Sequence, residues 1–358
     1  MTLILVLSLF GLPLHAQEKW MVGPFLKVDS TNPCLASNPS SRFLCPIRHE
    51  NVSWEAKDVF NPAAVAHEGK VYLLYRAQDS IGKPAGTSRI GLSWSSDGLR
   101  FTRYPFPVVY PDNDFMKQYE WEGGCEDPRM VQNARGTYVM TYTAFDGKLA
   151  RLAVATSSDL LHWTKQGLAF GESHGGKYRD VWSKSGSIVS RWVNGSPVAT
   201  KIGGRYWMYW GESDISLATS EDLLHWTPVE DKDGSLVSVL RKRLNSFDSR
   251  LVEPGPPAFM TASGIVLIYN SCNSGGSGDA SLPSGTYAAG QALFAGDDPT
   301  RLIGRSASYF FHPEKPYEKT GQVNNVCFLE GLVRFKGRWL LYYGTADSRI
   351  AVALWDHP

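Results

Sequence analysis

Cysteine is scarce in this sequence, and its few copies show no ligand spacing. No CxxC pair occurs, so the sequence does not predict a zinc site, and the odd count leaves at least one thiol free. An oxidising compartment would permit one disulfide, for which Cys34 and Cys45 are the nearest pair, but we expect buried free thiols instead. The five cysteines are Cys34, Cys45, Cys125, Cys272 and Cys327.

An excess of charge of either sign is also lacking. The chain carries 36 basic against 35 acidic side chains, a net charge of +1. Nucleic acids and anionic membranes attract basic surfaces, so we expect neither as the main partner. The motifs HExxH, GxSxG, GxGxxG and the P-loop do not occur in a suitable context, so the sequence predicts no metal and no cofactor.

Long hydrophobic runs are missing, apart from one at the N-terminus. The run from Leu3 to Leu14 is too short to cross ~30 Å of hydrocarbon as a helix. It resembles the apolar region of a signal peptide with cleavage after Ala16. We therefore predict a signal peptide over residues 1–16, an exported (periplasmic or extracellular) protein without membrane insertion, and one domain over residues 17–358.

What the sequence does contain is a repeated, aromatic-rich strand pattern. Each copy is a five-residue run of β-forming side chains, usually preceded by a turn that contains Gly. Successive copies begin 59 to 74 residues apart. The copies span residues 71–75, 138–142, 206–210, 265–269 and 339–343.

A second repeated segment follows three of these strands. It spans residues 90–98, 152–160 and 215–223 and ends in a Ser-x-Asp or related turn, whose side chains can bond the backbone. His162 and His225 follow equivalent turns, so we expect a structural role for both. Repeats of about 65 residues without helical periodicity indicate four-stranded blades. The sequence thus predicts an all-β, five-bladed β-propeller; a β-sandwich is the alternative, but it would not explain the repeat.

Polar residues gather where the repeated strands begin or end. Four clusters stand out, at residues 58–64 with Arg76, at 120–129, at 209–214 and at 247–257. The third contains Glu212 and the fourth Glu253, each next to an apolar strand. A carboxyl group in such a place can have a raised pKa and act as a general acid, and glycoside hydrolysis uses two carboxyl groups.

Four segments together resemble glycoside hydrolase family 130. They are Asn-Pro-Ala-Ala at 61–64, Leu-Tyr-Arg-Ala at 74–77, Gly-Cys-Glu-Asp-Pro-Arg at 124–129 and Met-Thr-Tyr-Thr-Ala at 140–144. The similarity runs from about Val22 to the C-terminus. The family contains β-mannoside phosphorylases and β-1,2-mannosidases on a five-bladed propeller. The resemblance therefore implies this fold and a β-mannoside oligosaccharide as substrate.

The sequence departs from the family's phosphorylases at the places that bind phosphate. Asp127 matches the aspartate that donates a proton through a mannose hydroxyl in those enzymes. Residues 201–206 lack the expected His-Arg pair, and Glu253 precedes Pro-Gly-Pro-Pro where phosphorylases tend to carry Gly. Together with Glu212, this resembles the exported hydrolytic branch, in which two glutamates act as acid and base in an inverting reaction.

The resemblance thus favours an exo-acting, inverting β-mannosidase for β-1,2 or other β linkages. Glu212 and Glu253 would form the acid–base pair, with the roles between them open. A phosphorylase with Asp127 as acid is the alternative, and a non-catalytic glycan-binding propeller is a second one. Trp121 and Tyr209 are candidate stacking platforms. The residues expected to hold the terminal mannose are Asn61, Arg76, Asp127, Arg129 and Lys184.

Overall fold

The computed structural model describes residues 18–83 and 85–356, so the predicted signal peptide lies outside the described residues. The described chain is nearly all β-structure. Its helices are two single turns, α1 (Lys117–Glu120) and α2 (Pro316–Lys319), and the 3-10 turn η1 (Ser173–Gly176). The all-β prediction is confirmed.

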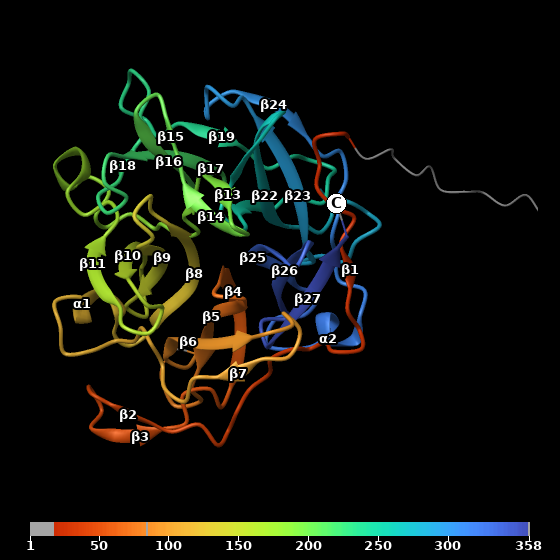
Figure 1. Ribbon diagram of the computed structural model, residues 1–358. Helices are drawn as coiled ribbons and strands as arrows, with labels where there is room; N and C mark the ends of the chain where they lie inside the picture. The colour runs from red at the N-terminus through yellow and green to blue at the C-terminus, as the bar shows by residue number, and fades with distance from the viewer. Residues whose placement is uncertain (1–17, 84, 357–358) are drawn as a thin grey trace, which may run out of the picture.

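Most strands form five antiparallel groups, here called units one to five, which lie around a common centre in Figure 1. Unit one consists of β4 (Asp58–His67), β5 (Lys70–Gln78), β6 (Ser88–Ser95) and β7 (Thr102–Arg103). Unit two consists of β8 (Gly124–Gln132), β9 (Tyr138–Phe145), β10 (Ala150–Ser157) and β11 (Thr164–Leu168). Unit three is β12 (Ser187–Ile188), β15 (Lys201–Ile202), β16 (Arg205–Trp210), β17 (Ile215–Ser220), β18 (Thr227–Pro228) and β19 (Ser238–Leu240). Unit four is β20 (Leu251–Pro254), β21 (Phe259–Thr261), β22 (Gly264–Cys272), β23 (Tyr287–Phe294) and β24 (Leu302–Arg305). Unit five is β25 (Cys327–Phe335), β26 (Arg338–Thr345), β27 (Arg349–Trp355) and β1 (Leu26–Lys27).

Short parallel contacts join neighbouring units. Ser88 of β6 pairs with Gly124 of β8. The hairpin of β13 (Ser190–Val193) and β14 (Ser196–Ala199) reaches β8 on one side and β21 on the other. A separate hairpin, β2 (Phe43–Cys45) with β3 (Glu50–Val52), projects from the body in Figure 1. The first strands of units five, one and two also lie side by side, since β4 contacts both β25 and β8.

The repeated aromatic runs are the second long strands of the units. They lie in β5, β9, β16, β22 and β26, and most of their apolar residues are buried because each sheet packs against its neighbours on both faces. Every residue of β22 is buried. The third strand leaves room for the large rings: a Cβ added at Gly91 or Gly290 would lie within 2.6 Å of the ring of Tyr75 or Tyr269.

The predicted Ser-x-Asp turns form as expected. The Ser157 hydroxyl accepts hydrogen bonds from the backbone amides of Asp159 and Leu160. The Asp159 carboxylate accepts hydrogen bonds from the backbone amides of Leu161 and His162. The same carboxylate holds the His162 ring at 2.7 Å, and Asp222 holds His225 in the equivalent turn. These histidines are exposed parts of turns, which agrees with a structural role.

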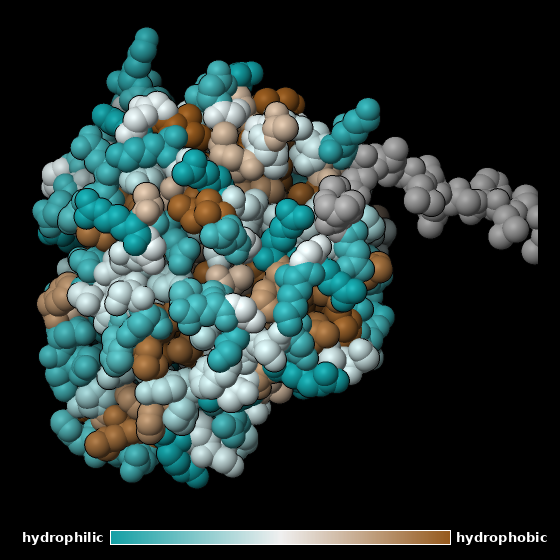
Figure 2. Space-filling view, in the orientation of Figure 1, coloured by the Kyte–Doolittle hydropathy of each residue, from teal (hydrophilic) through white to brown (hydrophobic). Residues whose placement is uncertain are grey.

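The surface carries no broad apolar face in the view of Figure 2, where hydrophobic side chains lie as small patches among polar ones. Among the described residues, no helix is long and apolar enough to cross a membrane. All five cysteines are free thiols, four of them buried, and Cys34 and Cys45 are not bonded to each other.

Candidate active site

Irregularities in the first strands of three units aim polar side chains at the centre. The register shifts at Asn61 in β4, at Asp127 in β8 and at Glu330 in β25. Asn61 and Asp127 have left-handed backbones, with φ of 49° and 47°. Because a bulge adds a residue to one strand, it can redirect a side chain that the regular pleat would place elsewhere.

Units three and four, with the stretch before unit three, contribute further polar groups. Lys184 and Ser185 come just before β12, Glu212 follows β16, and Glu253 lies in β20. After Glu253 the sequence Pro-Gly-Pro-Pro interrupts the strand before β21 begins. A Cβ on Gly255 would lie 2.9 Å from the carbonyl oxygens of Ile268 and Leu329, so this turn needs glycine.

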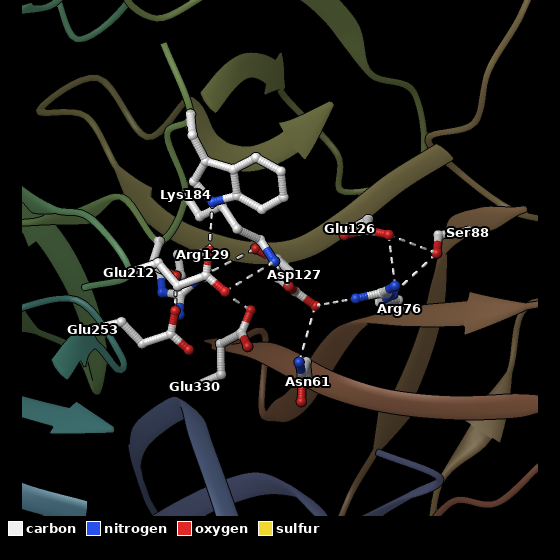
Figure 3. Close-up of polar contacts among 12 residues, drawn as sticks. Asn61, Arg76, Ser88, Glu126, Asp127, Arg129, Lys184, Glu212, Glu253 and Glu330 are labelled. Carbon is white, nitrogen blue, oxygen red and sulfur yellow. Dashed lines mark hydrogen bonds and ion pairs between the residues drawn. The ribbon is translucent and has the colours of Figure 1, made fainter. Parts of the chain in front are cut away.

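These side chains line one pocket. Figure 3 shows the carboxyl groups of Asp127, Glu212 and Glu253 pointing toward a shared space, with Arg76 to one side. Apolar side chains of the stretch before β25 and of β25 itself, Val323, Val326 and Phe328, also line this space. The pocket is lined by Asn61, Arg76, Asp127, Lys184, Glu212, Glu253, Tyr287, Val323, Val326, Phe328 and Asp347.

Asp127 is held as a carboxylate. Its Oδ1 accepts hydrogen bonds from Asn61 at 2.9 Å and from Arg76 at 3.2 Å, and Lys184 Nζ lies 3.9 Å from its Oδ2. Burial alone would raise the pKa of Asp127, but the charges of Arg76 and Lys184 outweigh it and lower this pKa. Arg76 also donates to Glu126 at 2.6 Å. Asp127 is therefore an ionised hydrogen-bond acceptor at the pocket wall.

Glu253 is held in the opposite state. It is 5% exposed, and burial together with the nearby charge of Glu212 raises its pKa to about 8. Ser185 Oγ donates to its Oε2 at 3.2 Å. Glu212 is 30% exposed, with Lys184 Nζ 3.9 Å from its Oε1 and the Trp182 indole donating to its Oε2 at 2.5 Å. Glu253 is thus mostly protonated at neutral pH, while Glu212 faces two hydrogen-bond donors, Lys184 and Trp182.

Arg129 does not line the pocket, which corrects its predicted role as a sugar ligand. Its guanidinium donates to the carbonyls of Pro254 and Gly255, both at 2.7 Å, and its side chain is 1% exposed. It also lies 3.5 Å from Glu330, whose burial raises its pKa well above the usual value. Because its donors are directed to the protein interior, Arg129 positions the turn next to Glu253.

Of the two predicted stacking platforms, Tyr209 is wrong. Tyr209 is completely buried, with its hydroxyl donating to the Pro299 carbonyl and its ring 4.8 Å from that of Phe294. Trp121 is partly buried against the core of unit one, under the guanidinium of Arg48, and does not line the pocket. The Tyr209 ring packs in the interior, which is the usual place for such side chains, whereas stacking by Trp121 stays a prediction.

Several pocket residues are absent from the sequence prediction. Asp347, whose burial raises its pKa to about 6, follows the fifth aromatic strand. A repeat could have revealed it, because an Asp or Asn stands four residues after the last aromatic residue of all five runs. Tyr287 is the first residue of β23, and Trp182, which donates to Glu212, lies in the connection before β12. Neither belongs to a repeated segment, so no pattern marks them.

Among residues 18–83 and 85–356, no three His, Cys, Asp or Glu side chains are arranged as a metal site. The Asp127 carboxylate, for instance, is already engaged by Asn61 and Arg76. The arrangement offers protonated and ionised carboxyl groups beside several acceptors for hydroxyl groups.

The pocket is polar, contains paired carboxyl groups and lies among antiparallel sheets. These features are typical of proteins that act on carbohydrates. A family model agrees. Residues 26–357 match the model of glycoside hydrolase family 130, described as beta-1,4-mannooligosaccharide phosphorylase. The chain belongs to glycoside hydrolase family 130.

Curated relatives of this chain are phosphorylases. It is 31% identical to a 1,2-beta-oligomannan phosphorylase of Thermoanaerobacter sp. (strain X514), over 84% of this chain and 90% of the relative. It is 28% identical to a beta-1,2-mannobiose phosphorylase of the same organism, over 87% of this chain and 93% of the relative.

Solved structures with higher identity have hydrolase descriptions. A glycosyl hydrolase from Bacteroides ovatus is 47% identical, with a TM-score of 0.92 over 95% of each chain. Another structure is 48% identical, with a TM-score of 0.93 over 95% of each chain. Its description states that family 130 of mannoside phosphorylases contains glycoside hydrolases that target beta-1,2 mannosidic linkages in Candida mannan.

Proposed function

We propose that this chain is an exo-acting, inverting β-mannosidase that hydrolyses β-1,2-linked mannosides. The charge of the pocket carries this proposal. Two cations line it, Arg76 and Lys184, and each faces carboxyl groups of the protein. A phosphate dianion needs Arg, Lys or His donors that are free to hold it. The surplus of carboxyl groups favours water as the nucleophile.

In the proposed reaction, Glu212 and Glu253 act as the acid–base pair. One of them gives a proton to the departing glycosidic oxygen, while the other takes a proton from the water that attacks the opposite face of the sugar. The cavity, of about 130 Å³, is smaller than the ~300–1,000 Å³ of pockets for drug-sized ligands. It suits a single terminal sugar ring, with Asn61, Arg76, Asp127 and Lys184 binding its hydroxyl groups.

Two features outside the pocket complete the proposal. The five units would close into a five-bladed propeller, with β1 joining the N-terminal end to β27 in unit five. Residues 1–16 would direct export to the periplasm or the cell exterior and be removed. Sequencing the N-terminus of the secreted protein tests the second point, for which we expect Gln17 first.

Phosphorolysis is a second candidate because the curated relatives named above are phosphorylases. Asp127, in the Glu-Asp-Pro-Arg segment, would then be the acid. A glycan-binding protein without turnover is a third possibility, and the same assay tests it.

The experiment follows β-1,2-mannobiose with and without inorganic phosphate and identifies the product. We expect mannose at equal rates in both conditions, released as the α-anomer by NMR. Strict dependence on phosphate, with mannose 1-phosphate as product, would sink the hydrolase proposal, and binding without turnover would favour the third candidate.

Variants then test the acid–base pair. We expect Glu212→Gln and Glu253→Gln each to lower kcat by about 10²–10⁴-fold. The variant that still cleaves an aryl mannoside with a good leaving group identifies the acid, because such a group leaves without protonation. Glu172→Gln, at an exposed carboxylate paired with Arg179, is the control. Unchanged turnover in either pocket variant would remove that residue from the pair.

A further inference from the structure

Trp182 is a half-exposed aromatic residue at the edge of the candidate pocket. Its side chain is 46% exposed, although most tryptophans of this chain are buried or partly buried. It comes from the connection between units two and three, outside every repeat. Its ring meets Phe145 edge to face, with centroids 6.5 Å apart.

The loop that carries Trp182 is anchored on both sides. Asp180 accepts two hydrogen bonds from Arg151, at 2.8 and 3.1 Å, and Arg151 is also paired with Asp146 of unit two. The Ser183 backbone amide donates a hydrogen bond to the Ala150 carbonyl at 3.0 Å. The Ser183 hydroxyl accepts a hydrogen bond from the Leu152 backbone amide. The indole is thus held in place by its neighbours rather than by the pocket.

The indole N–H meets the more exposed carboxyl group of the proposed acid–base pair. Indole nitrogen is a donor only, and it donates to Glu212 Oε2 at 2.5 Å. The other oxygen of Glu212 faces Lys184 Nζ at 3.9 Å (Figure 3). Since Glu212 follows the end of β16 and is 30% exposed, these two donors fix a side chain that the strand alone would leave free.

We propose that Trp182 is a positioning and specificity-determining residue: its N–H orients the Glu212 carboxyl group, and its exposed ring contacts the sugar on the leaving side of the bond. This inference rests on the proposed function. An exo-acting enzyme buries the terminal sugar, so the next sugar emerges at the mouth of the pocket. With Glu212 as the acid of the pair, the exposed indole beside it lies next to the departing sugar, and a rigid ring binds the apolar face of a sugar at low entropic cost.

Two substitutions separate the two roles. Trp182→Phe keeps an aromatic ring and removes the N–H, so we expect kcat on β-1,2-mannobiose to fall about ten-fold, with little change in KM. Trp182→Ala removes both, so KM should also rise, by about five-fold. With methyl β-mannoside, whose leaving group is too small to reach the ring, the two variants should show the same KM as the wild-type enzyme.

Phe106→Ala is the matched control, because Phe106 is 48% exposed and does not line the pocket. It should leave both constants unchanged. Failure of the proposed function would show in the wild-type enzyme, as no phosphate-independent turnover. Failure of this inference would show as normal wild-type turnover with kcat and KM unchanged in both Trp182 variants. A KM effect of Trp182→Ala that is as large on methyl β-mannoside would overturn the leaving-side contact.

Discussion

Glu253 is a carboxyl group that the fold keeps away from water and beside other acids. Burial has the largest effect on its pKa and raises it, and the nearby Glu212 and Asp127 raise it further. Lys184 and Arg129 lower the pKa, but by less. The folded protein therefore binds a proton there that the unfolded chain releases near its ordinary pKa. The direction follows from linkage: the protonated side chain is well tolerated at low pH, and the cost of ionising it grows as pH rises from about 4.5 to 8.

Glu253→Gln should accordingly stabilise the protein at alkaline pH. Glutamine imitates the neutral acid, so we expect little change in the free energy of unfolding at pH 5. At pH 8.5 the variant should be more stable by on the order of 2–4 kcal/mol. Denaturant unfolding at both pH values measures this difference. A gain that is equal at pH 5 and pH 8.5 would contradict the raised pKa.

Some site residues can be predicted from the sequence because they interrupt a regular pattern. Asn61, Asp127 and Glu253 are polar residues at or next to Pro inside strands that are otherwise apolar. The predicted role of Arg129 is wrong because the sequence shows that an Arg lies near the site, but not the direction in which its guanidinium group points. The carbonyls that bind it belong to another unit, 125 and 126 residues later.

At the scale of the elements, four of the five units share one buried arrangement. The last tyrosine of the aromatic strand donates to an acidic residue, which also binds a cation. In unit two, Tyr142 donates to Glu120 at 2.7 Å, and Lys165 lies 2.5 Å from the same group. Tyr75, Tyr269 and Tyr343 make equivalent bonds, to Glu55, Asp248 and Glu318. Unit three has Trp210 at this position, and its buried Nε1 has no hydrogen-bond partner.

Tyr142→Phe tests what this arrangement contributes. The variant leaves Glu120 buried with one donor fewer, so we expect a loss of about 1–3 kcal/mol in the free energy of unfolding. Thermal unfolding should show a midpoint lower by about 2–5 °C. Tyr72→Phe, at a partly exposed tyrosine of β5, is the control. Equal midpoints for the two variants would show that the tyrosine hydroxyl contributes little.

The repeat made the strands predictable, whereas the connections between them were not. Alternation and aromatic content identify β5, β9, β16, β22 and β26 because local sequence decides which short segments are extended. Tyr209 lies in such a strand, and its direction depends on packing against unit four, which no local pattern records. Trp182 depends on the Arg151 anchor of its loop in the same way.

At the scale of the whole molecule, the first described strand completes the last unit. Leu26 and Lys27 of β1 pair with Leu354 and Ala353 of β27. Lys27 Nζ also reaches the buried Glu318 at 2.8 Å and the His312 carbonyl at 2.7 Å. The cation of the unit-five arrangement therefore comes from the opposite end of the chain.

Lys27→Met should weaken this junction strongly. It leaves the buried Glu318 without its cation, a kind of change that costs about 3–5 kcal/mol. We expect an earlier denaturant midpoint than for Lys19→Met, the control at an exposed lysine. If both variants unfold at the wild-type midpoint, β1 does not hold the two ends of the chain together.

The pairing of β1 with β27 also sets an order of events during folding. Its two strands are separated by nearly the whole chain, so this contact has the largest loop-closure cost and is expected to form last. Until it forms, β27 presents an open edge that other chains can join. The interval before closure is therefore when a newly made copy of this protein is most exposed to aggregation.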